Sequence, residues 1–355
     1  KLGKALYQKT SRTQEPIMRL LIAAYEKASS GIASYTAEVT KLLAERDLDV
    51  SLLSFDEPPL EVSSRVNVTR FEVKHKSRAL PFLTFVLNER RLKDIEKDFD
   101  VIFETLPPWG SLGEKIVTVK WGYISYLRLA YIRTVGLSFP ENLGGFLVTL
   151  QHYLMDRRSS RRARHVISFV EGVADFVPPV IERRAIKDYE CDKTLRVLFV
   201  SRDLNMPRKN LRVVLAALKR VKRPIELHLV GRGDVEVPPG HKVINHGYLS
   251  REEVLSLMRR VDLQVLPSTY EELGFVGLEA YSVGLPLITS DIPSFRSVFR
   301  PSPKFDPRDP VKLTEILESV TCDELRELGK KEWDYVAEMN EKAISKLMKI
   351  FNDIY

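Results

Sequence analysis

Short apolar runs alternate with helical patterns along most of the chain. In the first half, strands are expected at 19–24, 50–55, 66–73, 101–105, 116–121 and 165–170. Helical spacing follows residue 31 and recurs near 82–97 and 142–155. Buried strands separated by helices predict an α/β domain with a parallel sheet, which takes ligands at the carboxyl ends of its strands.

The second half repeats this architecture without repeating the sequence. Strands are expected at 195–201, 225–231, 242–245, 263–267 and 287–290, and the pattern is helical after Pro310, with a break near Thr321. The segment 171–194 carries Pro178-Pro179, mixed charge and little periodicity, which is typical of an interdomain linker. We therefore predict domains at 18–183 and 184–331 and a final helix at 332–355. Residues 1–17 are interpreted as a leader or N-terminal arm, since Met18 directly precedes the first strand.

Two carboxylates flank a glycine in the segment 267–280. The apolar-rich run 261–266 predicts a buried strand, and helical spacing begins at Gly274, so the segment predicts a strand, a loop and a helix. The backbone N–H groups of Gly274, Phe275 and Val276 would form the helix N-terminus, which favours a phosphate. Glu271 would lie in the loop beside that anion, and Glu279 about two turns into the helix. Carboxylates there would accept hydrogen bonds from hydroxyl groups, which suggests a sugar linked to the phosphate.

This segment resembles the E-x7-E signature of retaining glycosyltransferases with the GT-B fold, especially glycosyltransferase family 4 (glycosyl transferases group 1). Four further segments in or around it resemble motifs of the family. Arg202 and Lys209-Asn resemble its Arg…Lys-Gly phosphate-binding stretch, and 278–286 resembles its E-A-x-A-x-G-x-P run. The segments 229–234, with Gly231, and 245–249, with Gly247 and Tyr248, resemble its nucleotide-side turns. Together these motifs occur in family order between about residues 195 and 300.

The resemblance implies two Rossmann-like domains that face a cleft, with the C-terminal helix crossing back to the first domain. It implies a retaining enzyme that moves a hexose from a nucleoside-diphosphate sugar to a hydroxyl acceptor, such as a glycan, a lipid-linked molecule or a small molecule. Arg202 and Lys209 would stabilise the departing diphosphate, Glu271 would orient the donor sugar, and Glu279 would bind the ribose. The remaining donor-side residues would be Gly31, Gly231, Gly247, Tyr248, Gly274, Phe275 and Val276.

Three positions depart from the family pattern. Glu272 stands where the family has glycine, and Ser30-Gly31 keeps one glycine of a glycine-rich loop. Lys120 stands where the family has a histidine near the sugar, so it is a candidate acceptor or phosphate contact or else a surface residue. The alternatives are therefore a nucleotide-sugar epimerase or phosphorylase of the same fold, or a non-catalytic subunit that binds nucleotide-sugars.

No metal or other cofactor is expected. The D-x-D pairs Asp47/Asp49 and Asp98/Asp100 precede strands, at the end of a parallel sheet where ligands do not bind. The two cysteines lie in separate regions, which argues against a disulfide framework or zinc site and favours a reducing cytoplasm. No secretory signal peptide is evident at the N-terminus, and no apolar run is long enough to span a bilayer.

The net charge is +7, and two basic clusters lie in the first domain. Apolar residues accompany the first, and together the clusters suit an anionic membrane surface or a lipid-linked acceptor; a solvated charged surface is the alternative. We therefore predict a cytoplasmic protein, with a peripheral position on the inner membrane face as the further expectation. No nucleic-acid recognition motif accompanies the charge, so nucleic acid is not an expected partner. The clusters are Arg65, Arg70, Lys74, Lys76, Arg78, Arg90, Arg91 and Lys93, and Arg157, Arg158, Arg161, Arg162 and Arg164.

Overall fold

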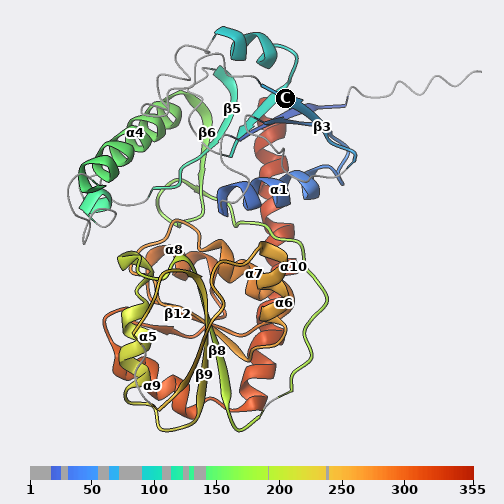
Figure 1. Cartoon of the computed structure of the whole chain (residues 1–355). Helices are drawn as coiled ribbons and strands as arrows, with labels where there is room; N and C mark the ends of the chain where they lie inside the picture. The colour runs from blue at the N-terminus through green and yellow to red at the C-terminus, as the bar shows by residue number, and fades with distance from the viewer. Residues whose placement is uncertain are drawn as a thin grey trace, which may run out of the picture.

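The computed structural model contains two α/β domains, each built on a parallel sheet (Figure 1). It describes residues 17–24, 31–54, 64–71, 90–105, 113–122, 128–131, 141–190, 192–236 and 240–355. Three residues of the first basic cluster, Lys74, Lys76 and Arg78, and the N-terminal arm at 1–16 lie outside the described residues.

The described part of the first domain has a seven-stranded parallel sheet in the order β3-β2-β1-β4-β5-β6-β7. Each strand predicted in this half is present with small differences at its ends, and β7, of two residues, was not predicted. Of the helix expected at 82–97, residues 90–96 are helical, and 82–89 lie outside the described residues. The elements are β1 (Arg19–Ala24), α1 (Gly31–Leu43), β2 (Asp49–Ser54), β3 (Asn67–Arg70), β4 (Val101–Glu104), β5 (Gly113–Val119), α4 (Glu141–Arg162), β6 (Ala163–Ser168) and β7 (Asp175–Phe176).

The second domain has a six-stranded parallel sheet in the order β10-β9-β8-β11-β12-β13. Helices follow the strands because the intervening segments have helical apolar spacing, and β13 was not predicted. The elements are β8 (Leu195–Asp203), the 3-10 helix η1 (Pro207–Lys209), α5 (Leu211–Leu218), β9 (Ile225–Arg232), β10 (Lys242–Asn245), α6 (Arg251–Met258), β11 (Leu263–Leu266), α7 (Phe275–Val283), β12 (Leu287–Ser290), α8 (Pro293–Val298), β13 (Lys304–Phe305), α9 (Pro310–Ser319) and α10 (Cys322–Ile354).

Helix α10 joins the two domains. Its 33 residues run from the second domain to the first, where the C-terminus lies (Figure 1). Thr321 caps its N-terminus in a capping box with Glu324, which explains the break in the helical pattern at that point. At the other end, the Phe351 ring lies 5.7 Å from the Phe103 ring of β4. The predicted returning helix at 332–355 is thus the later part of a helix that begins at Cys322.

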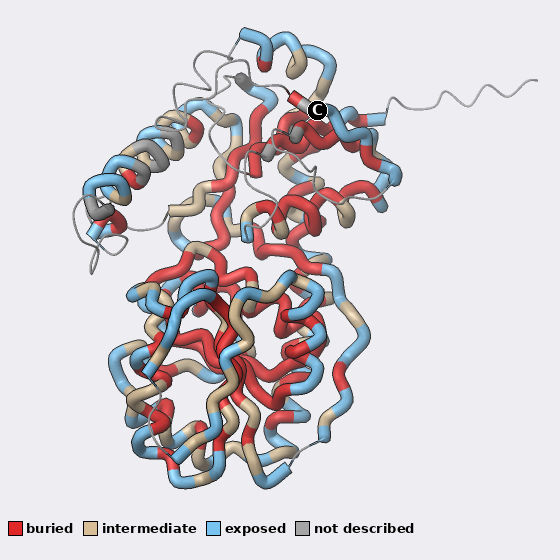
Figure 2. Tube along the Cα trace, viewed as in Figure 1, coloured by how far each residue is buried: buried red, intermediate tan, exposed pale blue. Residues whose placement is uncertain are grey.

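One cluster of buried apolar side chains extends through both domains. It includes Leu20 and Val39 of the first domain, Phe295 of the second, and Val336 and Leu347 of α10. In Figure 2, the buried residues, coloured red, continue from one domain into the other. Because the interdomain contact is part of a hydrophobic core, the two domains are packed against each other rather than tethered only by the linker.

Cys322, the first residue of α10, is disulfide-bonded. The expectation that the cysteines form no disulfide was therefore wrong. Sequence separation misled this prediction, because the fold decides which cysteines come within bonding distance. The low cysteine count does not by itself argue for a reducing compartment, and the localisation stays a prediction.

Candidate active site

Glu271 lies against two cations that precede α5. The Arg208 guanidinium donates to its Oε1 over 2.6 Å, and the Lys209 ammonium contacts the same oxygen. Glu271 is buried. Burial raises the pKa of its carboxyl group, but the positive charges of Lys209 and Arg208 outweigh that effect and leave the pKa below its usual value. Glu271 is therefore an ionised carboxylate held by two cations.

Backbone geometry explains why Lys209 meets Glu271. Asn210, which follows Lys209 where the family motif has glycine, has φ 59° and ψ 40°, in the left-handed region. Asparagine tolerates this conformation better than most residues with a side chain. Its Nδ2 also donates to the carbonyl oxygens of Pro267 and Pro307, over 3.0 and 2.7 Å. Asn210 thus turns the chain after η1 and ties it to the loop that carries Glu271.

The same loop is held from two further sides. The backbone N–H of Thr269 donates to the Arg208 carbonyl oxygen over 2.9 Å. The Ser294 hydroxyl of α8 donates to the Glu271 carbonyl oxygen over 2.7 Å. These bonds place Glu271 between η1 and the N-terminus of α8, with little freedom for its backbone.

Helix α7 begins beside this loop, as the sequence predicts. Its N-cap, Gly274, has φ 71°, and no side chain caps the N-terminus. A Cβ at Gly274 would lie 2.7 Å from the Phe295 ring, so both the conformation and the close packing require glycine. Gly274, Phe275 and Val276 thus form an uncapped helix N-terminus that can receive an anion.

Glu279 belongs to a second ion-pair cluster, which crosses the domain interface. The Arg251 guanidinium donates to Glu279 Oε1 over 2.7 Å and to Glu38 Oε1 over 2.8 Å. Glu38 comes from α1 of the first domain and also accepts from the backbone N–H of Glu182 over 2.8 Å. Burial raises the pKa of Glu279 above its ordinary value, and Arg251 only partly offsets this. The proposed ribose carboxylate is therefore bonded, through Arg251, to the first domain.

Three other predicted donor-side residues lie at the carboxyl ends of β9 and β10. The Gly231 N–H donates to the Gly247 carbonyl oxygen over 2.8 Å, which joins the two strand ends. A Cβ at Gly231 would lie 2.2 Å from the Ser201 carbonyl oxygen of β8, so no side chain fits there. Tyr248 is exposed, and the Arg232 guanidinium lies 5.4 Å from its ring centroid.

Gly31 begins α1, and a Cβ there would lie 3.3 Å from the Phe275 Cβ. The N-termini of α1 and α7, one from each domain, therefore approach each other closely. That Gly31 lies on the donor side stays a prediction, since no ligand contact tests it.

Within the described part of the chain, two candidate residues form no ion pair or hydrogen bond with Glu271 or Glu279. Arg202 is an exposed residue near the carboxyl end of β8, and its contact with the diphosphate stays a prediction, whereas the cation that bonds Glu271 beside Lys209 is Arg208. Lys120 follows β5 in the first domain, where it is half-buried and its charge acts on Asp156 of α4. Burial raises the pKa of Asp156 to about 6, although Lys120 opposes the shift. Lys120 thus has a carboxylate near it, and its role in the site stays a prediction.

Sequence reasoning missed Arg208, Arg251 and Glu38. Arg208 directly precedes Lys209 in the sequence, and its position alone did not distinguish it from a solvated charge. A signal for Glu38 was present: it falls on the apolar face of α1 between Tyr35 and Val39, and a charge buried on such a face requires a partner. Nothing in the sequence identified Arg251 as that partner.

The two facing parallel-sheet domains and the returning helix define a GT-B fold. Sucrose-phosphate synthase from Thermosynechococcus elongatus superposes with a TM-score of 0.69, covering 95% of this chain and 99% of that one, at 15% sequence identity. At this identity the likeness shows the fold alone. The predicted fold class is confirmed.

Residues 194–323 match the family model of glycosyl transferases group 1. The predicted resemblance is therefore confirmed for the second domain, and membership of family 4 in particular stays a prediction. Glycogen synthase of Mycobacterium tuberculosis is 36% identical over 96 residues, which is 24% of this chain and 23% of that protein. Phosphatidyl-myo-inositol mannosyltransferase of the same species is 33% identical over 114 residues, 29% of this chain and 30% of that protein. The aligned part thus spans less than a third of the curated relatives.

Among the residues that the structure describes, no group of three or more His, Cys, Asp and Glu side chains is arranged to hold a metal ion. Within the same residues, no helix combines the length and apolar character needed to cross a bilayer. The expectation of a metal-independent site stays a prediction.

Proposed function

We propose that this protein is a retaining glycosyltransferase that uses a nucleoside-diphosphate sugar. This proposal rests mainly on the ion pairs that Arg208 and Lys209 of η1 form with Glu271. Glu271 lies in the loop just before the uncapped N-terminus of α7. A diphosphate at that terminus would meet backbone N–H groups and two cations, while Glu271 would accept hydrogen bonds from the donor sugar. The group 1 match over the same domain supports this reading.

We infer the course of the reaction by analogy with the family that the chain resembles. An acceptor hydroxyl oxygen forms a bond to the anomeric carbon of the donor sugar, and the bond from that carbon to the diphosphate oxygen breaks. The leaving diphosphate takes the acceptor's proton, which keeps the chemistry on one face of the sugar and retains its configuration. Lys209 and Arg208 stabilise the negative charge that develops on the diphosphate. Glu271 keeps both cations at the donor side before the substrate arrives.

Glu279 would bind the ribose hydroxyls. In the structure its carboxylate is bonded to Arg251, so ribose binding shares or replaces that contact. Because Arg251 also holds Glu38 of the first domain, donor binding would act on a contact between the two domains. Binding of a donor would therefore change the contact that Arg251 makes between α1 and α7.

A panel of nucleoside-diphosphate sugars tested by thermal stabilisation would identify the donor, since a ligand that binds the folded state raises apparent stability. Lys209→Ala should weaken nucleoside-diphosphate binding by about 1.5–3 kcal/mol, the value of a lost charge-assisted contact. Lys219→Ala is the matched control, because Lys219 is an exposed lysine at the other end of α5. Equal binding by both variants and the parent would remove Lys209 from the site.

Sugar transfer also separates this function from its alternatives. Release of free nucleoside diphosphate together with a glycosylated acceptor identifies a transferase. Conversion of the donor without any acceptor identifies an epimerase, and phosphate-dependent breakdown of a glycan identifies a phosphorylase. Donor binding without any turnover would favour a non-catalytic subunit.

We further propose that the first domain binds an anionic membrane surface. Helix α4, which lies at one side of the first domain (Figure 1), presents Leu143, Phe146, Leu147 and Leu154 as exposed apolar side chains. Arg157 and Arg161 follow in the same helix. Exposed apolar residues beside arginines suit the interface of an anionic bilayer.

Sedimentation with vesicles tests this proposal. Each basic side chain near the surface contributes about 1 kcal/mol, so several together bind anionic vesicles and high salt releases the protein. Replacing Arg90, Arg91 and Lys93 by serine, and separately Arg157 and Arg161, should reduce binding while nucleotide binding in the second domain is unchanged. Equal sedimentation with anionic and neutral vesicles would show that these basic side chains form only a solvated surface and do not bind membranes.

A further inference from the structure

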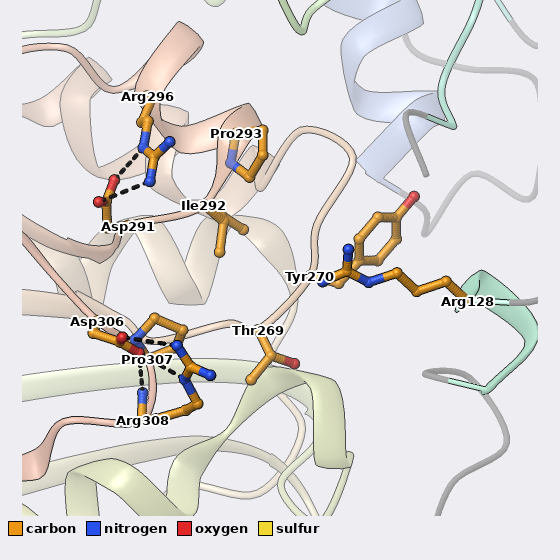
Figure 3. Close-up of a pocket in the computed structure, with 10 residues that line it drawn as sticks. All are labelled: Arg128, Thr269, Tyr270, Asp291, Ile292, Pro293, Arg296, Asp306, Pro307 and Arg308. Carbon is orange, nitrogen blue, oxygen red and sulfur yellow. Dashed lines mark hydrogen bonds and ion pairs between the residues drawn. The ribbon is translucent and has the colours of Figure 1, made fainter. Parts of the chain in front are cut away.

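A pocket of about 420 Å³ opens beside the Glu271 loop, at the contact between the two domains. Tyr270, Asp291 and Asp306 line it from the segments that follow β11, β12 and β13, three strands that are neighbours in the sheet. Arg128 lines it from the first domain and points toward Tyr270 (Figure 3). The pocket therefore occupies the carboxyl edge of the second sheet, where ligands of parallel sheets bind.

The charges in the pocket do not cancel. Arg296 bonds Asp291 through two nitrogens, over 2.5 and 2.9 Å, and Arg308 bonds Asp306 in the same forked manner, over 3.1 Å each. Each aspartate that lines the pocket thus has its own arginine. Among the residues that the structure describes, the side chains that line the pocket include no further carboxylate, so none of these balances the Arg128 charge. The described lining therefore carries a net positive charge supplied from the first domain.

The polar groups around that charge suit a hydroxylated ligand. A carboxylate offers about four acceptor sites; each forked arginine occupies two of them, and the Arg308 backbone N–H takes a third on Asp306. Asp291 and Asp306 can therefore still accept hydrogen bonds from hydroxyl groups, as can the Thr269 hydroxyl, which also lines the pocket. Ligand hydroxyl oxygens can in turn accept from the guanidinium groups. Vicinal hydroxyls of a sugar match this alternation of donors and acceptors.

The pocket adjoins the donor side. Tyr270 and Glu271 are consecutive residues, and Ser294 of α8 bonds the Glu271 backbone, as described above. A molecule in the pocket would lie across the loop that carries the donor carboxylate, and Arg128 would contact it from the opposite domain. An acceptor bound there would lie next to the loop whose carboxylate is proposed to orient the donor sugar.

We propose that this pocket is the acceptor subsite and that it takes an anionic sugar, one that carries a phosphate or carboxylate group. The inference rests on the proposed transferase function and specifies its acceptor. Arg128 pairs with the anionic group, and the Asp291–Arg296 and Asp306–Arg308 pairs bind the hydroxyls. The transferred sugar then bonds to a free hydroxyl that faces the Glu271 loop.

Calorimetric binding to the full chain tests the proposal with four probes: glucose 6-phosphate, glucuronic acid, glucose and inorganic phosphate. We expect the two charged sugars to bind about tenfold or more tightly than glucose, as one charge-assisted contact implies. Arg128→Ser should abolish that preference. Arg326→Ser should leave it intact, because Arg326 is an exposed arginine of α10, paired with Asp323, that does not line the pocket.

Equal binding of glucose and the charged sugars would overturn the proposal, as would an unchanged preference in Arg128→Ser. Inorganic phosphate binding as tightly as glucose 6-phosphate would show a plain anion site instead of a sugar site. Nucleoside-diphosphate stabilisation of Arg128→Ser, measured in parallel, should equal that of the parent. If no nucleotide-sugar stabilises the parent, the proposed transferase function is contradicted. That result is independent of how the acceptor probes bind.

Discussion

Replacing Arg251 by methionine should destabilise the protein, because Arg251 is the cation shared by Glu38 and Glu279. The Glu38 side chain is 1% exposed and that of Glu279 is 10% exposed. Without Arg251, the Glu38 and Glu279 carboxylates would both lose the ion pair with this guanidinium. Removing one partner of a buried ion pair costs roughly 3–5 kcal/mol, because the remaining charge stays buried without compensation. We expect a loss of that order in the free energy of unfolding at pH 7.

Arg326→Met is the matched control. Arg326 pairs with Asp323 over 2.7 Å, with side chains 53% and 84% exposed, and an exposed pair of this kind contributes roughly 0–1 kcal/mol. Urea unfolding followed by circular dichroism would measure both variants beside the parent. The difference between the two losses in free energy of unfolding measures how much more a buried, shared arginine stabilises the protein than an exposed one.

The pH dependence gives a second measurement. Burial already raises the pKa of Glu279, and loss of Arg251 should raise it further. A carboxyl group whose folded pKa is raised contributes stability that is lost as the pH rises through that value. The deficit of Arg251→Met should therefore be larger at pH 8 than at pH 5. A variant that unfolds like Arg326→Met, or whose deficit is the same at both pH values, would refute a stabilising role for this bridge.

Three further predictions concern other parts of the molecule. Gly274→Ala should lose roughly 1–3 kcal/mol of stability from the left-handed conformation together with the Phe295 contact, whereas Gly172→Ala, with φ 80° and nothing within 4 Å of its Cβ, should lose less in the same unfolding measurement. Lys187 is buried and donates to the Val261 carbonyl oxygen, and burial lowers its pKa to about 8. Because the folded pKa lies below the unfolded value, the free energy of unfolding should rise between pH 8 and pH 9.5, and Lys187→Met should remove that slope. Transfer activity should survive EDTA, because cations of the chain neutralise the diphosphate; activity that is lost and then restored by magnesium or manganese would contradict this.

The apolar periodicity determined the elements, because burial of one face or of a whole strand imposes a pattern that can be read locally. The strand at 19–24 and the cap region at Thr321 follow from such patterns. Strands β7 and β13 have two residues each, too few to show a period, so they were missed. The motif around Glu271 and Glu279 was likewise local, because its residues share one strand, loop and helix.

Only the tertiary structure decided which charges meet. Arg251 lies 213 positions from Glu38 in the sequence, and Arg208 lies 63 from Glu271. These pairs depend on which strands are neighbours and on how α1 packs against α7, and charged side chains carry no period that reveals their partners. The contact of Arg208 with Glu271 and the position of Arg128 across the pocket have the same cause. The sequence by itself determined the longer elements and the motif around Glu271 and Glu279, and the packing of two domains determined the partners of the charged residues in that motif.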